Sequence, residues 1–559
     1  MGDLLVRGGT LIDGTGAAGR AADVRVRAGV IVEVGSGLAP DGERVVDAGG
    51  AIVAPGFIDN HTHVDPSLWW DASCDPLPQH GVTTVMMGNC SLSLAPVRAA
   101  DRAGVTSLFC YIEDLPDSAF DAAIPWTWET WPEYAAQART QGYGVNAAAF
   151  VGHTPLRIFV MGAEAWERPA TEAERAEMAR VLGASLAAGA LGLSTSMGFD
   201  EDRTKRPVPS RLADDAELGA LFDVIAEHRK TVQFIPAQSG GKAMMADVSR
   251  MAELCQPRHI PHTWIGVIYD EDRPWHATKM LDHARTLQEQ GANTLPQISP
   301  RTFDIRVNWA GGMSWYILEN SWHKMIQSGP DEKRRMLVDP AWRALAREEW
   351  DKHPRTMIPH QKPEMLRLVE VRKPELERWA GSSLADLVAE RGGHPSDVLA
   401  DWVLENDLDP GLVGVGVGNA DPDGVAETLK HPATLIGNSD AGAHLQMMCA
   451  TGDSTLLLTR HVRDRHDLTL EDAVHQITGR QAEVFGLEGR GVVREGNVGD
   501  LTVFALDELS WDEDVFVNDL PLGGARLRRP AGGYRMTAVS GDVTQEGGVL
   551  TDARPGALL

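Results

Sequence analysis

The run Ala54-Pro55-Gly56-Phe57-Ile58-Asp59-Asn60-His61-Thr62-His63-Val64-Asp65 organises the rest of this 559-residue chain. Its apolar residues, together with residues 51–53, predict one buried strand that ends at the two histidines. Alternate residues of an extended chain point to the same side, so we expect His61 and His63 to project together. Because neutral imidazole is the commonest ligand for zinc-like ions, this strand end is half of a candidate metal site.

The composition narrows the class of protein. A formal net charge of -27 argues against nucleic acid and anionic membranes as partners. No run approaches the ~18 apolar residues of a membrane helix, and the N-terminus carries no signal-peptide pattern. Five widely spaced cysteines do not indicate a disulfide framework. We therefore expect a reduced, cytoplasmic enzyme with a small-molecule substrate; whether it forms a homo-oligomer stays open.

Predicted strands alternate with predicted helices from residue 51 to about 437. A β-branched strand over 82–87 runs into Gly88-Asn89-Cys90. Apolar residues at helical spacing follow in 178–186 and 218–225, before a further strand over 231–235. This alternation predicts a parallel sheet, and polar residues at the strand ends indicate a (β/α) barrel with its site on that face.

The two ends of the chain share a different character. Short strands fill the first 50 residues and return after Gly489, which predicts one small β domain built from 1–52 and 487–559, around a barrel over 53–486. Residues 300–380 interrupt the barrel pattern and predict an insertion. It is rich in tryptophan, with Trp309, Trp315, Trp322, Trp342 and Trp350. The sequence leaves open whether the insertion covers the barrel mouth or packs at the periphery.

Four candidate ligands follow three separate predicted strands: His61, His63, Cys90 and Asp440. On a barrel these strand ends meet at one mouth. The carboxylate suits two tasks, binding a metal and taking a proton from its water, and a metal readily deprotonates a thiol. The alternatives are a buried, inert Cys90 and an Asp440 that serves only as a helix cap or turn residue.

At this point the chain resembles the amidohydrolase superfamily and, within it, the N-acyl-D-amino-acid deacylase (D-aminoacylase) branch. The matching motifs run through most of the chain in family order. They are Gly9-Thr10-Leu11-Ile12-Asp13-Gly14-Thr15-Gly16, the Pro-Gly-Phe-Ile-Asp-x-His-Thr-His run, Gly81-Val82-Thr83-Thr84, Gly88-Asn89-Cys90-Ser91, Tyr111-Ile112-Glu113-Asp114-Leu115-Pro116, Val151-Gly152-His153-Thr154-Pro155, Gly189-Ala190-Leu191-Gly192-Leu193-Ser194-Thr195, Ile436-Gly437-Asn438-Ser439-Asp440 and Gly489-Arg490-Gly491.

The resemblance implies a fold and a chemistry. The fold is a TIM barrel with a β-sandwich built from both termini. The chemistry is a zinc-type site that activates water for attack on an amide carbonyl. Residue by residue, His61 and His63 would be the first-strand ligands, Cys90 the bridging or primary thiolate, and Asp440 the last-strand ligand and base.

Three further residues are candidate substrate contacts. His153 would lie at the mouth as a substrate or oxyanion contact, or else be a core histidine. Ser194 belongs to the glycine-rich match at 189–195. His444 follows Asp440 by four residues and is a candidate helper or an ordinary loop residue.

The chain also departs from the deacylase pattern. The stretch 234–240 lacks the histidine, arginine and glutamate of the family's Thr-His-x-Arg-x-Glu, and 263–270 lacks its Ser-His-x-Lys. His259 or His262 would replace a lost ligand only in another register. The first lysine is Lys205, which excludes a carboxylated-lysine bridge of the hydantoinase kind. We therefore expect a single ion, Zn²⁺, with other divalent metals left open.

These observations favour a metal-dependent hydrolase that opens a C–N bond of an amide or cyclic amide, with Asp440 as the base. Two alternatives remain. The same site could act on an ester or lactone or in deamination, which release of ammonia or amine would distinguish. A barrel without catalysis could serve in binding, which the absence of bound metal would indicate.

Overall fold

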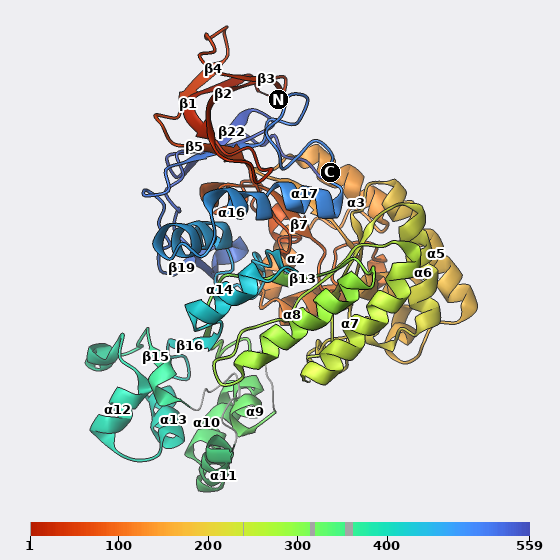
Figure 1. Cartoon of the computed structure of the whole chain (residues 1–559). Helices are drawn as coiled ribbons and strands as arrows, with labels where there is room; N and C mark the ends of the chain where they lie inside the picture. Colours follow the sequence, from red (N-terminus) through yellow and green to blue (C-terminus); the bar gives the residue numbers. More distant parts are fainter. Residues whose placement is uncertain (1, 239, 313–318, 353–361) are drawn as a thin grey trace.

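The computed structural model describes residues 2–238, 240–312, 319–352 and 362–559 (Figure 1). Parallel strands alternate with helices, which confirms the predicted α/β class. Two parallel sheets have the orders β6-β7-β8 and β17-β13-β12-β11-β10-β9. Their strands are β6 (Phe57–Asp59), β7 (Val82–Met87), β8 (Asn146–Ala149), β9 (Val151–Gly152), β10 (Gly192–Ser196), β11 (Thr231–Ile235), β12 (His262–Trp264), β13 (Thr294–Ile298) and β17 (Leu435–Ile436).

Backbone contacts join the two parallel sheets at both sides. Phe150, between β8 and β9, donates its N–H to Met87 of β7, and Leu191 donates to Ala149. On the other side, Thr62 forms a parallel bridge with Ala441. The strands therefore continue from one sheet into the next in both directions.

Helices connect these strands and cover their outer side. They are α1 (Arg102–Ile112), α2 (Asp117–Ala123), α3 (Trp131–Gln141), α4 (His153–Met161), α5 (Glu172–Ala187), α6 (Asp215–Glu227), α7 (Gly241–Cys255), α8 (Pro274–Glu289), α14 (Pro422–Lys430), α15 (Asp453–Leu456), α16 (Leu470–Gln476) and α17 (Gly479–Phe485). The apolar faces predicted at 178–186 and 218–225 belong to α5 and α6, and their residues lie in the main core. No helix of the described segments is both long and apolar enough to cross a membrane.

The strand predicted over 51–58 is two strands, because the chain changes sheet at Gly56. β5 (Ile52–Pro55) pairs with strands of the chain ends, whereas β6 pairs with β7. A Cβ at position 56 would lie 2.1 Å from the side chain of Thr83. Glycine is therefore required where the chain passes between the two sheets.

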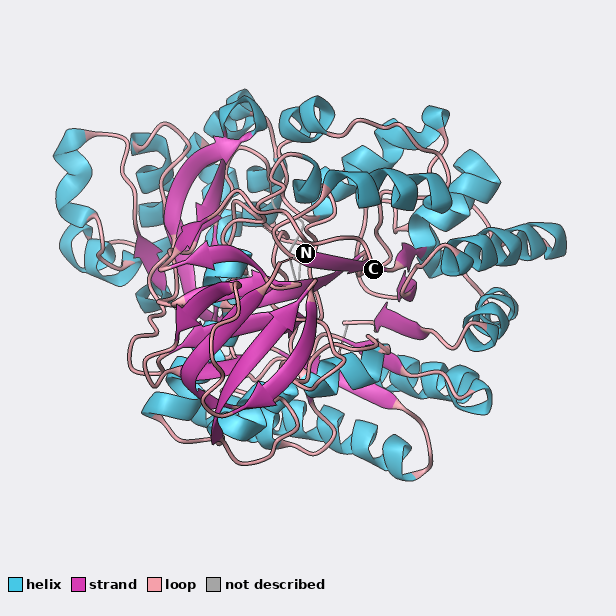
Figure 2. Ribbon diagram, turned by 90° about the horizontal axis from the view of Figure 1, so that it is seen from above, coloured by secondary structure: helices cyan, strands magenta, loops and turns pink. Residues whose placement is uncertain are grey.

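Both chain ends contribute strands to one nine-stranded sheet. Its strands are β1 (Leu4–Leu11), β2 (Arg20–Arg27), β3 (Val30–Gly35), β4 (Arg44–Asp47), β5, β18 (Leu501–Phe504), β21 (Met536–Val539), β22 (Asp542–Glu546) and β23 (Val549–Leu550). Figure 2 shows this sheet as a curved layer, with the two termini close together. A separate hairpin follows β18, made of β19 (Val515–Leu520) and β20 (Gly524–Arg528).

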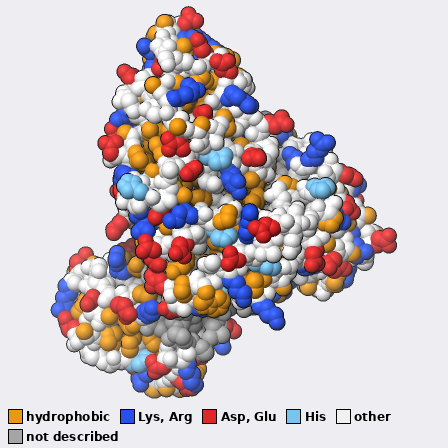
Figure 3. Space-filling model, viewed as in Figure 1, with side chains coloured by type: hydrophobic (Ala, Val, Ile, Leu, Met, Phe, Trp, Pro, Cys, Tyr) orange, Lys and Arg blue, Asp and Glu red, His pale blue; other side chains and the backbone are white. Residues whose placement is uncertain are grey.

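The insertion is a lobe with its own core, at the lower left of Figures 1 and 3. It extends beyond the predicted 300–380, to the end of β16, because helices α12 and α13 bury their apolar faces in the same core. Trp315 lies outside the described residues. The elements are β14 (Phe303–Arg306), α9 (Ser321–Gln327), α10 (Pro330–Val338), α11 (Pro340–Lys352), β15 (Leu366–Leu368), α12 (Leu384–Arg391), α13 (Pro395–Glu405) and β16 (Leu412–Gly418).

Acidic and basic side chains are interspersed over the face of the molecule shown in Figure 3. The net charge of -27 is therefore not gathered into one acidic patch on this face.

Candidate metal centre

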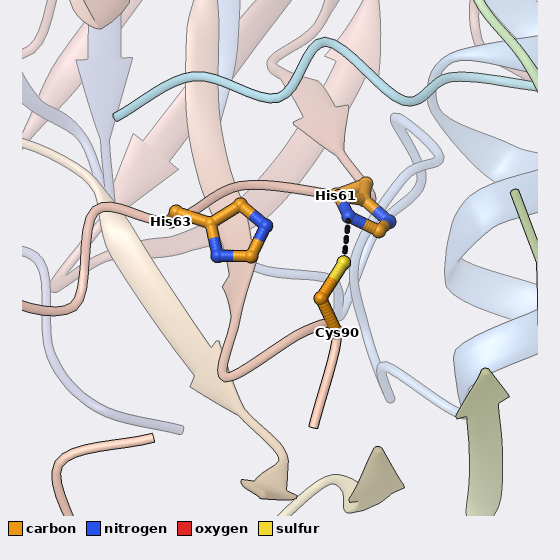
Figure 4. Close-up of side chains that lie close together, drawn as sticks. All are labelled: His61, His63 and Cys90. Atoms are coloured by element: carbon orange, nitrogen blue, oxygen red, sulfur yellow. Dashed lines mark hydrogen bonds between the residues drawn. The ribbon is translucent and has the colours of Figure 1, made fainter. Parts of the chain in front are cut away.

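Three candidate ligands come together beyond the ends of β6 and β7 (Figure 4). The ligand atoms of His61, His63 and Cys90 all lie within 4.8 Å of one another. His61 Nε2 is 3.2 Å from Cys90 Sγ. All three side chains are buried, at 0–8% exposure, so a bound cation would be shielded from solvent.

Asp440 lies in the loop after β17 and brings a carboxylate to the same point. Its Oδ1 is 3.4 Å from His63 Nε2 and 3.7 Å from His61 Nε2. His444 lies beside it, with Nε2 3.6 Å from Asp440 Oδ2. The structure thus brings the four candidate ligands predicted from the sequence, and His444, into one cluster in which only Asp440 is partly exposed.

A strained loop presents the Cys90 thiol. Cys90 and Ser91 have φ angles of 56° and 68°, in the left-handed region that non-glycine residues rarely adopt. Buried polar groups hold this conformation: Gln233 Oε1 accepts from the Cys90 N–H at 2.8 Å, and Ser194 Oγ accepts from the Ser91 N–H at 3.1 Å. The same Ser194 hydroxyl donates to the Gly88 carbonyl. The Cys90 loop is therefore fixed before any ligand binds.

The Asp440 loop is tied to the histidine segment by its backbone. Asp440 N–H donates to the His61 carbonyl at 2.9 Å, and His63 N–H donates to the Ala441 carbonyl at 2.7 Å. Arg301, which follows β13, donates from Nη2 to the Ser439 carbonyl at 2.7 Å. Backbone hydrogen bonds consequently join the segments that follow β6 and β17.

Burial and the neighbouring charges shift the pKa values of the clustered residues in different directions. Burial lowers the pKa of His61 to about 4 and raises the pKa of the Cys90 thiol to about 12. Burial would also lower the pKa of His63, but the Glu113 carboxylate raises it well above its usual value. Burial alone would raise the pKa of Asp440, yet the contact with His63 holds it well below the usual range.

Two residues that the sequence analysis did not single out lie behind the imidazoles. Gln297 Oε1, from β13, is 2.9 Å from His61 Nδ1. Glu113 Oε1 is 3.2 Å from His63 Nδ1. Glu113 belongs to the Tyr111–Pro116 motif, so the signal was present, but the residue follows a helix (α1) rather than a strand and was not placed at the mouth.

Two of the candidate substrate contacts have other roles in the structure. His153 is fully buried, with Nδ1 2.9 Å from Thr195 Oγ1 and Nε2 2.8 Å from Glu217 Oε1. It is the core histidine of the alternative reading, since both ring nitrogens are engaged. Ser194 is also buried and bonds the Cys90 loop, so its hydroxyl is committed to the protein.

His259 and His262 do not join the cluster. His259 ends the short helix before β12, and His262 is the first residue of that strand, at the end opposite the site. His262 packs against Phe234, with ring centroids 6.3 Å apart. On these two strands the polar residues Gln233 and Thr263 are register partners, and Gln233 Oε1 accepts from the Cys90 N–H.

The donor set fits a zinc-type ion. Two imidazoles, one thiol and one carboxylate are ligands that such an ion takes, and their ligand atoms lie close together. Among the described residues, this is the single group of three or more such ligands at metal-binding distances.

Comparisons with known proteins agree with this geometry. The amidohydrolase family model matches residues 44–347 and 384–545. An uncharacterised protein of Mycobacterium tuberculosis is 30% identical over 92% of this chain and 86% of its own length. The N-acyl-D-aspartate deacylase of Alcaligenes xylosoxydans xylosoxydans is 29% identical over 90% and 85%. The solved N-acyl-D-glutamate deacylase from Bordetella bronchiseptica, complexed with zinc and a phosphonate inhibitor, is 25% identical with a TM-score of 0.68, over 100% of this chain and 99% of that one. The predicted resemblance is thereby confirmed.

Proposed function

The chain belongs to the amidohydrolase family, and we propose that it is a metal-dependent hydrolase of a C–N bond in an amide or cyclic amide, similar to the N-acyl-D-amino-acid deacylases. The observation that carries this proposal is the convergence of His61, His63 and Cys90, with Asp440 within 3.7 Å of both imidazoles. Two relatives of the chain are named for small substrates, N-acyl-D-aspartate and N-acyl-D-glutamate.

We further propose that the parallel strands form one closed (β/α)₈ barrel over 53–486, and that the nine-stranded sheet is a β-sandwich made from 1–52 and 487–559. The contacts of Phe150, Leu191 and Thr62 between the two parallel sheets support closure. In such a barrel the site lies where enzymes of this architecture place it, at the carboxyl ends of the strands.

A zinc-type ion, when held by the cluster, supplies Lewis-acid activation of water and of the substrate carbonyl. Asp440 accepts the proton of the attacking water and passes it to the leaving nitrogen. His444, 3.6 Å from the Asp440 carboxylate, stabilises that carboxylate as it takes up and releases the proton. The buried loops of Cys90 and Asp440 keep these groups in place and exclude bulk water.

We propose one ion rather than two. The family's second position needs histidines at the ends of two later strands, where this chain has Gln233 and Thr263 as its inward polar residues. The arginine that reads the substrate carboxylate in the deacylases is likewise missing from 234–240. The leaving amine is therefore expected to differ from that of an ordinary N-acyl-D-amino acid.

Metal analysis of the purified protein tests the proposal. We expect about one equivalent of zinc or a similar divalent metal per chain, lost in His61→Asn/His63→Asn. The matched control is His262→Asn, since this buried histidine lies away from the cluster. Chelation should abolish hydrolysis of a panel of N-acyl amino acids, cyclic amides and lactones, and zinc should restore it.

The outcomes separate the alternatives. Release of amine or of a ring-opened acid from amides supports the C–N hydrolase, whereas turnover of lactones alone supports the ester reading. Two equivalents of metal would contradict a single ion. Absence of metal from the folded protein would overturn the function.

A further inference from the structure

The outer nitrogens of the two ligand imidazoles meet different partners. His61 Nδ1 faces the neutral amide of Gln297 at 2.9 Å, whereas His63 Nδ1 faces the carboxylate of Glu113 at 3.2 Å. Both Nε2 atoms face the cluster, since His61 Nε2 lies near Cys90 and His63 Nε2 lies near Asp440. The side of each ring that would bind the ion is therefore set by what lies behind it.

The end of α1 brings Glu113 to this position. The helix ends at Ile112, and the Glu113 N–H still donates to the Phe109 carbonyl at 2.9 Å. Asp114 then adopts a left-handed φ of 53°, which turns the chain away. Glu113 is 1% exposed, so bulk solvent does not screen the interaction between its carboxylate and His63.

The two adjacent acids face in different directions. Glu113 turns to His63, and its Oε2 also lies 3.9 Å from His444 Nε2. Asp114 turns to the insertion lobe, where it accepts from Asn308 Nδ2 at 2.6 Å, and from the Gln446 N–H at 3.2 Å. The end of α1 therefore contacts both His63 of the candidate metal centre and Asn308 of the insertion lobe.

We propose that Glu113 is a positioning residue for the metal centre. With its carboxylate 3.2 Å from His63 Nδ1, it favours the tautomer that carries a proton on Nδ1 and leaves the Nε2 lone pair toward the ion, and through its charge it makes that imidazole a stronger donor. A carboxylate behind a ligand histidine acts in this way at metal sites generally. This inference rests on the proposed metal site.

The need for such a partner follows from the small ligand set. A single ion held by two imidazoles depends on each of them more than an ion with further histidines would. Gln297 orients His61 without adding charge, so Glu113 is the group that raises donor strength in this pair. Removing its charge is expected to weaken metal binding more than removing an equally buried acid that faces elsewhere.

The test is zinc affinity, measured by chelator competition on the full chain. We expect Glu113→Ala to weaken zinc binding by about 10- to 100-fold and Glu113→Gln, which keeps an acceptor oxygen, by a smaller factor. The matched control is Asp114→Asn, whose side chain contacts no candidate ligand, and it should leave the affinity within about twofold. Cobalt in place of zinc gives a second measure, because its visible bands should shift in Glu113→Ala and not in Asp114→Asn.

The outcomes distinguish the two proposals. Unchanged affinity and cobalt bands in both Glu113 variants, with zinc bound to the wild type, would overturn the role of Glu113 alone. No zinc bound to the wild type would overturn the metal site together with it. Should Glu113→Ala fail to fold, Glu113→Gln decides, since it matches the glutamate in size.

Discussion

Replacing Asp440 by asparagine is expected to lower kcat by about 10²- to 10⁴-fold, the usual contribution of a general base. Asparagine keeps the shape of the side chain and an oxygen near both imidazoles, but it cannot take up the proton of water. Because Asp440 is also a candidate ligand, metal content must be measured on the same preparation. A loss of kcat at full metal loading identifies the base; a loss that zinc supplementation repairs identifies a ligand only.

The matched control for this variant is Asp421→Asn. Asp421 caps α14, which leads into β17, by accepting the N–H bonds of residues 423 and 424 on its two carboxylate oxygens. An asparagine at that position keeps one acceptor oxygen and remains a favoured helix cap. This variant should retain wild-type activity. If Asp440→Asn keeps more than about a tenth of kcat with metal bound, another group is the base.

Replacing Glu217 by glutamine is expected to destabilise the fold by about 3 kcal/mol or more at neutral pH, the typical result of breaking a buried ion pair. Glu217 lies on α6, and its Oε1 forms a hydrogen bond with His153 Nε2 at 2.8 Å. It also forms an ion pair with Arg157, and all three side chains are fully buried. The variant leaves the Arg157 charge without its counter-ion. Denaturant unfolding measures the loss.

The stabilisation that Glu217 provides should depend on pH. Burial alone would raise the pKa of Glu217, but the contacts with His153 and Arg157 lower it to about 2, from the usual 4.5. The stabilisation is therefore present above about pH 4.5 and is lost as the pH falls toward 2. The exposed Glu227 of the same helix supplies the control, Glu227→Gln, which should change stability by less than about 0.5 kcal/mol. The difference in unfolding free energy between the wild type and Glu217→Gln should shrink as the pH falls. A difference that stays the same in acid would contradict the role of the buried pair.

The sequence predicted the α/β class and the sharing of one sheet by both chain ends. Hydrophobic periodicity carries this information, because a buried strand or helix face must be apolar wherever it packs. The cluster of His61, His63, Cys90 and Asp440 followed from the rule that parallel strands end at one edge. Each of these inferences needs only local pattern and chain order.

What the sequence could not predict depends on packing across the fold. The requirement for glycine at position 56 comes from the close approach of Thr83, a residue of the next strand. The sequence alone places His153 equally well at the mouth or in the core. Its position in the core follows from the hydrogen bonds of its two ring nitrogens with Thr195 and Glu217. Glu113 was not placed because it reaches the cluster from a helix end. The insertion extends past 380 because α12 and α13 share a core that periodicity cannot assign to one lobe.

The pairing of β5 has a consequence for the order in which the protein assembles during synthesis. β5 lies between β1 and β18, and its partner Leu501 is made 446 residues after Pro55. Until then one edge of β5 has no partner strand. Gly56 alone connects β5 to β6 and the histidine segment. Domains usually fold in the order in which they emerge from the ribosome. Here β5 gains its second partner only after nearly the whole chain has been made, so this strand, which leads into the candidate metal centre, is among the last to be completed.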